Sequence, residues 1–343
     1  MKKHFYGILS TVMVLSVTTY VLLDTFILRS VYSTDASVDN SVAFAAAAEN
    51  MGSSSDDTEG EGSVSEDSTG NESEAGSTYT DEDGDVYAVT DNTSKTETDS
   101  SDSSYSDYSD DNVSISVKQY TYNNTQVYVA DITVSSAEYL KTALAENTYG
   151  KNVTVATSTI ASENNAVLAI NGDYYGAQES GYVIRNGQVY RSTSSSDTEI
   201  CCIYADGTMK IMNSSEKSAE ELVNEGVWQA FSFGPGLIED GEISVTADEE
   251  VGKAMASNPR TAIGMISANH YVFVVSDGRT SESEGLSLSE LAEFMQSLGV
   301  TEAYNLDGGG SSTMYYQGTV INKPTTDGRT IRERSVSDIV YVG

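Results

Sequence analysis

The sequence predicts an α+β fold over residues 113–343, with a mixed, largely antiparallel β-sheet packed by a few helices. Two observations predict it. Short apolar segments rich in Val, Ile and Tyr recur here, separated by turn dipeptides of the Asn-Gly and Asp-Gly kind. Segments with helical periodicity are few. Because hairpin signals outnumber helices, antiparallel pairing is expected to dominate.

These turn dipeptides and apolar segments predict the positions of the strands along the chain. Residues 113–134 predict two strands joined at Asn123-Asn124. Two further hairpins are expected to turn at the Asn-Gly and Asp-Gly pairs of residues 186–187 and 206–207. Apolar runs predict the remaining strands within residues 165–176, 261–279, 301–318 and 334–343.

Three helices are predicted by capping boxes, in which a Ser is followed three positions later by a Glu. These are residues 135–146, 218–226 and 287–299. The third is the clearest, because its apolar residues share one face and Gly299 stands where a helix commonly ends.

The N-terminus predicts a membrane anchor. Two lysines precede 19 residues without a formal charge, Phe5 to Leu23. Residues 1–32 are therefore expected to be a signal anchor that places a single-pass protein in the cell membrane, with the rest of the chain extracellular. A cleaved signal peptide is the alternative, with a small-x-small site near Ala43 to Ala45, and the protein is then secreted.

Residues 33–112 predict a disordered tether. They hold 22 acidic residues and one basic residue, Lys95, with few large side chains. Such a segment buries too little apolar surface to offset the entropy of ordering. A polyanionic cation-binding tail is the alternative. The net charge of the whole chain, −34, excludes nucleic acid as a partner.

Histidine and cysteine usage narrows the chemistry. The chain has two histidines, His4 and His270, so neither a multi-His zinc site nor a Ser-His-Asp triad is expected. The two cysteines are adjacent, Cys201 and Cys202, and a strand would point them to opposite faces. The domain is therefore expected to depend on its core and not on disulfides.

Three apolar strands end alike, with a carboxylate in a glycine-containing turn. The carboxylates are Asp173, Asp277 and Asp307. If these strands are central in one sheet, their ends lie near one another and form a polar site. The alternative for each is ordinary Asp-Gly turn chemistry.

The last of these turns contains Gly308, Gly309 and Gly310, followed by Ser311. Consecutive backbone amides in such a turn can bind an anion, and tight packing of the turn is the alternative. Arginines stand near three strand ends, at Arg260, Arg279 and Arg334. Guanidinium groups bind phosphate well, although Arg279 could instead pair with its neighbour Asp277.

The ordered motifs "AINGDYYG", "FSFGPGLIEDG", "NPRTAIG", "VVSDGRT", "AYNLDGGGSSTM" and "RSVSDIVYV" resemble the phosphodiester glycosidase family. The resemblance covers about residues 115–343. It implies hydrolysis of a sugar-1-phosphodiester, such as a GlcNAc-1-phosphodiester of a cell-envelope or extracellular glycan, at the glycosidic C1–O bond.

On this resemblance Asp173 and Asp307 are the catalytic carboxylates beside an oxocarbenium-like transition state. The implied substrate-binding residues are Asn171, Arg260, Asp277, Arg279, Asn305, Gly308, Gly309, Gly310, Ser311 and Arg334. Asn171 and Asn305 are expected to orient sugar hydroxyls, and the others to bind mainly the phosphate. No cofactor is required, but Asp173 and Asp307 could instead hold Ca²⁺. Phe233 could stack on a sugar face.

Two other functions remain open from the sequence. One is a metal-dependent phosphodiesterase that cleaves the P–O bond. The other is a non-catalytic surface module that binds glycan phosphates.

Overall fold

The computed structural model describes residues 29–33, 40–53, 78–80, 86–88, 105–195, 198–245 and 257–343. The chain divides into two units. One spans residues 56–98, in which β2 (Thr78–Thr80) pairs with β3 (Val86–Ala88), and the other contains everything else. Residues 1–28 of the expected anchor lie outside the described residues, and its last residues, from 29 to 32, are described and belong mainly to β1 (Ser30–Ser33). Within the described residues no helix has the length and apolarity to span a membrane.

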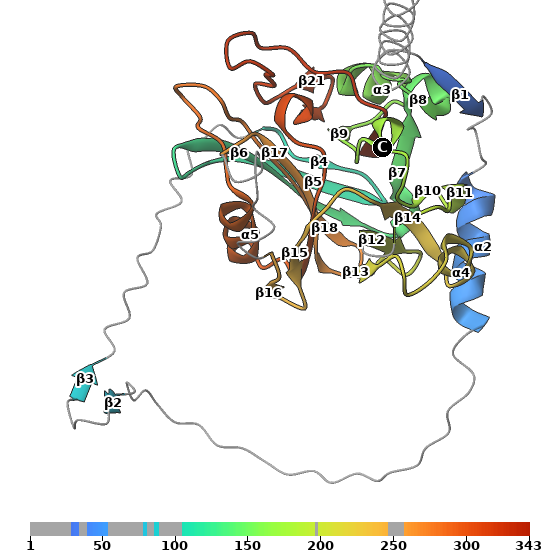
Figure 1. Cartoon of the computed structure of the whole chain (residues 1–343), viewed down its shortest axis with the longest axis horizontal. Helices are drawn as coiled ribbons and strands as arrows, with labels where there is room; N and C mark the ends of the chain where they lie inside the picture. Colours follow the sequence, from blue (N-terminus) through green and yellow to red (C-terminus); the bar gives the residue numbers. More distant parts are fainter. Residues whose placement is uncertain are drawn as a thin grey trace, which may run out of the picture. The chain divides into compact units, whose positions relative to one another are not determined.

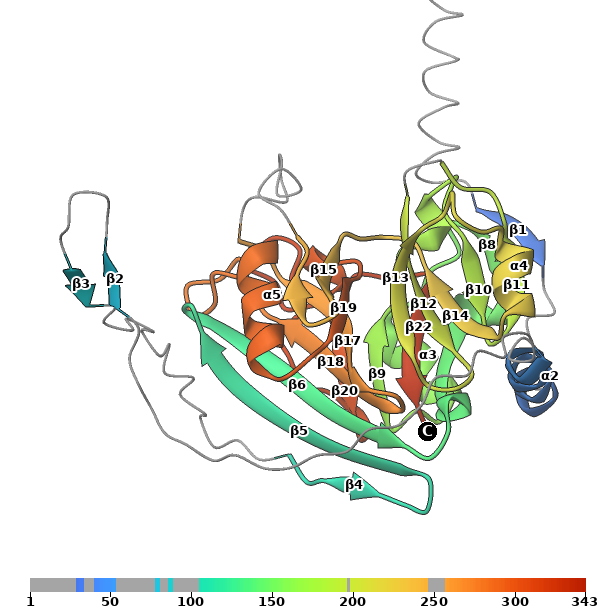
Figure 2. The ribbon, with the colours of Figure 1, turned by 90° about the horizontal axis from the view of Figure 1, so that it is seen from below.

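The largest sheet of the main unit has eight strands (Figures 1 and 2). Its order is β16-β15-β19-β17-β18-β6-β5-β4. In that order the strands are Glu242–Ile243, Gly236–Glu239, Glu302–Asn305, Arg260–Ser267, His270–Ser276, Thr125–Val134, Val113–Tyr122 and Tyr108–Ser109. Helix α5 (Leu288–Ser297) packs its apolar face on this sheet.

Two five-stranded sheets complete the unit. One has the order β11-β10-β14-β12-β13, that is Gln188–Arg191, Val183–Arg185, Val227–Phe231, Glu199–Tyr204 and Met209–Asn213. The other has the order β21-β20-β9-β22-β7, that is Thr319–Val320, Met314–Tyr316, Leu168–Asn171, Asp338–Val342 and Leu140–Leu144. One apolar cluster joins all three sheets, with Ile115, Ile170 and Phe231 among its members.

The α+β prediction is confirmed, and the strand pairing among the described residues is antiparallel throughout the three sheets. The Asn123-Asn124 turn joins β5 and β6, with positive φ at both residues. Helices α4 (Ala219–Asn224) and α5 begin at the predicted capping boxes. Helix α3 (Thr157–Glu163) has no side-chain cap, so the sequence lacked a start signal for it.

The predicted helix over residues 135–146 is wrong. Strand β7 occupies its centre, between the single 3-10 turns Ala137–Tyr139 and Ala145–Asn147. Leu140, Thr142 and Leu144 alternate with less buried neighbours, as a strand requires. Their pairing with β22 outweighs the predicted Ser135/Glu138 capping box, which does not form: Ser136 caps the short turn instead, and Ser135 Oγ donates to Asn112 Oδ1.

The predicted tether contains an ordered part. Helix α2 (Asn40–Ser53) packs beside α4 and β14 (Figure 1). Phe44 of α2 meets Trp228 edge-to-face with ring centroids 5.1 Å apart. Before it, β1 (Ser30–Ser33) pairs with β8 (Tyr149–Lys151). An alanine-rich run favours helix, and Ala47 is buried. Disorder therefore does not describe residues 40–53, where the alternative cleavage site Ala43–Ala45 also lies.

Candidate active site

The ends of β9 and β19 meet although they belong to different sheets. The Asp307 amide donates to the Gly172 carbonyl at 3.2 Å, and Asn171 Nδ2 donates to the Asp307 carbonyl at 2.6 Å. Asn171 Oδ1 accepts from Thr261 Oγ1 at 2.8 Å and from the Thr313 amide at 3.2 Å. Asn171 is fully buried, so it joins strand ends and does not reach out to a sugar hydroxyl.

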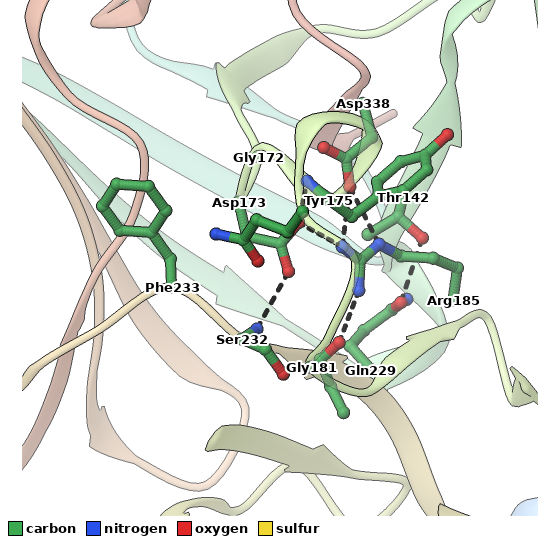
Figure 3. A network of polar contacts seen from close by, with 12 residues as sticks. Thr142, Gly172, Asp173, Tyr175, Gly181, Arg185, Gln229, Ser232, Phe233 and Asp338 are labelled. Carbon is green, nitrogen blue, oxygen red and sulfur yellow. Dashed lines mark hydrogen bonds and ion pairs between the residues drawn. The ribbon is translucent and has the colours of Figure 1, made fainter. Parts of the chain in front are cut away.

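Asp173 has no exposed surface and is held by three donors (Figure 3). Its Oδ1 accepts from Arg185 Nη2 at 2.8 Å and from the Tyr175 amide at 3.2 Å. Its Oδ2 accepts from the Ser232 amide at 2.9 Å. A carboxylate bound in this way stabilises the turn, and neither of its oxygens is exposed to a substrate.

Arg185 and Asp338 complete this buried network, and no motif in the sequence indicated a role for either. Arg185 Nε donates to Asp338 Oδ2 at 2.8 Å, its Nη1 donates to the Ala230 carbonyl, and its guanidinium lies 4.5 Å from the centre of the Phe231 ring. In the sequence Arg185 appears as an ordinary hairpin residue. Only the fold shows that a fully buried cation serves two buried carboxylates.

The charges of this network do not balance, because two carboxylates share one guanidinium. Burial, reinforced by the neighbouring Asp173, raises the pKa of Asp338 to about 7. Asp338 Oδ1 has no hydrogen-bond partner among the described residues. A proton on Asp338 is therefore favoured in mildly acidic solution.

Asp307 faces a different neighbourhood from Asp173. Its Oδ2 accepts from Arg334 Nη2 at 2.6 Å, and Arg334 Nε donates to Ser311 Oγ at 2.7 Å. The side chain of Arg334 is 39% exposed and its guanidinium lies 5.4 Å from the centre of the Tyr174 ring. Burial raises the pKa of Asp307, while Arg334 and Ser311 oppose the rise. These residues put a carboxylate and a cation together at the edge of solvent.

The triple glycine is tightly packed, which favours a packing role for these glycines over anion binding. A Cβ on Gly308 would lie 2.9 Å from the Pro259 carbonyl oxygen, and one on Gly309 would lie 3.0 Å from Arg279 Nη2. A Cβ on Gly310 would meet Thr326 Oγ1. The Gly309 amide donates to the Pro259 carbonyl at 2.8 Å, so this amide is not open to an anion.

The other predicted charged residues separate into buried and exposed groups. Arg260 is buried and donates from Nε to the Leu286 carbonyl at 2.8 Å. Arg279 is exposed, and it donates to the Thr326 carbonyl at 2.9 Å and to Asn258 Oδ1. Asp277 is buried, and burial raises its pKa.

Among the described residues, the hydrogen-bond partners of Asp277 differ from those of the other two carboxylates. Its Oδ1 accepts from the Lys323 amide at 2.8 Å and from Asn322 Nδ2 at 3.2 Å, which fixes the loop after β21. Its strand lies two places from β19 in the eight-stranded sheet. The expectation that three strands of one sheet deliver the site is wrong, because β9 belongs to another sheet.

An aromatic side chain stands close to the buried network. Phe233 is 37% exposed, and it follows Ser232, whose amide binds Asp173 (Figure 3). Its own amide donates to Tyr304 Oη at 3.0 Å. Asn305 Nδ2 donates to the Gly234 carbonyl at 2.8 Å, so Asn305 positions the turn that carries Phe233. Asn305 Oδ1 is buried without a partner in the described part of the chain.

A calcium site built on both aspartates does not fit this arrangement. The oxygens of Asp173 accept hydrogen bonds from N–H groups, including a guanidinium, which leaves no room for a cation. Within the described residues, no group of three or more His, Cys, Asp or Glu side chains is placed to hold a metal ion.

The fold and the candidate site together define a class of protein. This is an antiparallel α+β domain whose partly exposed polar centre combines Asp307, Arg334 and Ser311, with Tyr174 stacked beside it. Such a centre suits a ligand that carries both an anion and a carbon on which positive charge develops.

Comparison with known proteins gives the family. Residues 164–343 match the phosphodiester glycosidase family model, and the chain belongs to that family. Mouse N-acetylglucosamine-1-phosphodiester alpha-N-acetylglucosaminidase is 31% identical over 193 residues, which are 51% of this chain and 37% of the mouse protein. The SPbeta prophage-derived protein YomE of Bacillus subtilis is 27% identical over 250 residues, which are 67% of this chain and 38% of that protein.

A solved structure shares the fold. The catalytic domain of the zebrafish N-acetylglucosamine-1-phosphodiester alpha-N-acetylglucosaminidase superposes with a TM-score of 0.53 at 20% identity, over 67% of this chain and 82% of that one. The chain spans less than two fifths of the length of the curated relatives named above.

Proposed function

We propose that this protein is an exported glycosidase that hydrolyses the C1–O bond of sugar-1-phosphodiesters, with GlcNAc-1-phosphodiester-like linkages of cell-envelope or extracellular glycans as substrates. The observation that carries the proposal is the contact of Asp307 Oδ2, just after β19, with Nη2 of the partly exposed Arg334 at 2.6 Å. The family and the mouse relative support the reaction class.

Arg334 binds the phosphate in this proposal. Its Nε and Nη2 are occupied by Ser311 and Asp307, while its Nη1 has no hydrogen bond to the described residues. A guanidinium held in this way presents its free edge to a phosphate oxygen. Arg279, which lies close to Gly309, is a second exposed arginine beside the turn.

Asp307 acts at the sugar carbon. As the C1–O bond lengthens, positive charge develops on the sugar ring, and a nearby carboxylate stabilises it or attacks C1. The departing phosphodiester oxygen is weakly basic, so it leaves with little protonation, and Arg334 balances its charge. Phe233 and Tyr174 offer aromatic surfaces for the sugar.

Asp173 acts as a positioning residue in this proposal. It holds the Ser232 amide, the Tyr175 amide and Arg185, and so fixes the turns that carry Phe233 and Tyr174. Asn171 and Asn305 do the same for the strand ends, and the triple glycine lets the turn approach Pro259 and Thr326.

The test uses the full-length protein with a methyl phosphodiester of α-GlcNAc-1-phosphate and with UDP-GlcNAc, in ¹⁸O-labelled water, with and without EDTA. We expect free GlcNAc with the label on the sugar and no effect of EDTA. Asp307→Asn should lose at least about 10³-fold in kcat/KM. Asp277→Asn is the matched control, because Asp277 is also a buried carboxylate at a strand end but binds a loop.

Two outcomes contradict the proposal. Label on the phosphate, lost with EDTA, identifies a metal-dependent phosphodiesterase. Saturable binding of the phosphodiesters without any product identifies a glycan-phosphate-binding module.

Export through residues 1–32 is part of the same proposal. Its support is the uncharged run from Phe5 to Leu23 behind two lysines. Protease treatment of intact cells should remove the domain if it is anchored outside, and mass spectrometry of the N-terminus distinguishes an anchored chain from a cleaved one.

A further inference from the structure

A pocket of about 190 Å³ lies beside the turn that follows β9. Strand β1, strand β8 and the 3-10 turn η3 (Tyr175–Ala177) form its walls. Tyr32, Tyr149, Lys151, Tyr175, Glu179 and Arg191 line it. Drug-sized ligands fill pockets of about 300–1,000 Å³, so this one suits a single small ring.

Three tyrosines line the pocket, of which Tyr32 is exposed while Tyr149 and Tyr175 are 8% and 1% exposed. Tyr149 stacks on Tyr175 with centroids 5.3 Å apart and an interplanar angle of 22°, and Tyr32 contributes a ring 5.6 Å from Tyr149. Tyr32 is 61% exposed, so its ring is accessible to a ligand. Flat apolar faces beside polar groups are the surfaces on which the C–H face of a sugar packs.

The cationic side chains that line the pocket already have hydrogen-bond partners. Lys151 Nζ lies 2.7 Å from Glu179 Oε1. Arg191 donates from Nε to the Gly181 carbonyl, from Nη1 to the Tyr175 and Gln178 carbonyls and from Nη2 to the Ser180 carbonyl. A phosphate would have to compete for these cations, whereas hydroxyl groups can add to the Lys151–Glu179 pair. The chemistry therefore favours a neutral sugar.

The pocket and the candidate active site share one turn. Tyr174 stacks on Arg334 at the active site, and the next residue, Tyr175, is a wall of the pocket. The Tyr175 amide also donates to Asp173. A ligand with one sugar at Asp307 and a further sugar in the pocket would run along residues 173–178.

We propose that this pocket is a second carbohydrate subsite, which binds a neutral sugar unit away from the cleaved linkage and makes the enzyme act on oligomeric glycans. The proposal rests on the proposed function. It adds to that function an extended substrate and a role for β1, which brings Tyr32 to the site.

The experiment compares the full-length protein with Tyr32→Ala, Tyr32→Phe and Val31→Ala. Val31 is the matched control, since it is 49% exposed on the same strand and is not among the residues that line the pocket. Substrates are the methyl phosphodiester of α-GlcNAc-1-phosphate and a phosphodiester whose leaving alcohol is a neutral trisaccharide. Calorimetric binding of N,N′,N″-triacetylchitotriose is measured in parallel.

We expect Tyr32→Ala to raise KM for the trisaccharide substrate about fivefold to tenfold, with kcat unchanged and the methyl substrate unaffected. Tyr32→Phe and Val31→Ala should match the wild type. Equal effects on both substrates, or none, would overturn the proposal.

The binding measurement separates this proposal from the reaction. If neither phosphodiester is hydrolysed, the proposed function fails, yet chitotriose binding that weakens in Tyr32→Ala still supports the subsite. If hydrolysis occurs but chitotriose does not bind at millimolar concentration, the subsite proposal fails alone.

Discussion

At the residue scale, the contrast between Asp173 and Asp307 decides the chemistry. Both follow apolar strands and precede glycine-containing or aromatic turns, so the sequence treats them alike. Asp173 is closed in by Arg185 and two backbone amides, whereas Asp307 shares the partly exposed Arg334. The difference arises from partners that are distant in the sequence.

The pH dependence of activity should reflect Asp307. Burial raises its pKa, so the reactive carboxylate is lost as pH falls through a value above the ordinary range of about 3.9. Ser311 lowers this pKa, and Ser311→Ala should therefore move the acid limb of kcat/KM to higher pH. An unchanged acid limb in Ser311→Ala would show that another group sets it.

The pH dependence of stability should reflect Asp338. Its folded-state pKa is raised from 3.8 to about 7, so the folded protein favours the protonated form. The corresponding stability is complete below the unfolded pKa, near 4, and is lost as pH rises toward 7.

The measurement is the free energy of unfolding of wild type and Asp338→Asn by urea, from pH 4 to pH 8. Relative to the variant, the wild type should lose about 4 kcal/mol at most over this range. If the difference in free energy of unfolding between wild type and Asp338→Asn does not change with pH, the raised pKa of Asp338, and its cause in two carboxylates sharing Arg185, would be contradicted.

At the element scale, the turn Gly309–Ser311 and helix α2 show two ways in which short segments are fixed. The turn is fixed by close approach, with glycine where side chains would meet Pro259, Arg279 or Thr326. Helix α2 is held by a small number of apolar side chains, because Val42 and most of its neighbours are exposed.

Gly310→Ala should destabilise the protein, because the new methyl group meets the Thr326 hydroxyl. The cost should be about 1–3 kcal/mol, as for other overpacked sites. Adding Thr326→Gly should recover part of it, as measured by thermal unfolding. Equal melting temperatures for wild type and Gly310→Ala would show that the turn has room.

Phe44→Ala should release α2 from the main unit. The Phe44 ring contacts Trp228, which is the sole tryptophan of the chain, so its fluorescence reports on the contact. We expect a change in tryptophan emission and a loss of about 1 kcal/mol in stability. Val42→Ala, at a 65% exposed position of the same helix, should change neither.

At the scale of the whole molecule, the main unit contains the complete candidate site and the pocket, while residues 56–98 form a unit of their own. Residues on both sides of that unit contribute to the main one: β1 and α2 come before it, and β4 to β22 after it. In the sequence, residues 56–98 are therefore an insertion between two parts of the main unit.

Replacing residues 56–98 with a Gly/Ser sequence of equal length should leave the melting temperature and kcat/KM unchanged, because these residues form a separate unit and none of them belongs to the candidate site. Removing residues 29–53 as well should lower the melting temperature and expose Trp228. A loss of activity in the first variant would show that the acidic segment takes part in function.

The sequence by itself determined the fold class, the hairpin turns and two of the helices, because glycine, asparagine and capping residues act locally. It also singled out Asp307, Ser311 and Arg334. It could not separate Asp173 from Asp307, or find Arg185 and Asp338, because burial and ion pairing join segments far apart in the chain. Only the tertiary structure decided which carboxylate is paired with a partly exposed arginine, because Arg185 and Arg334 reach Asp173 and Asp307 through the fold and not through the local sequence.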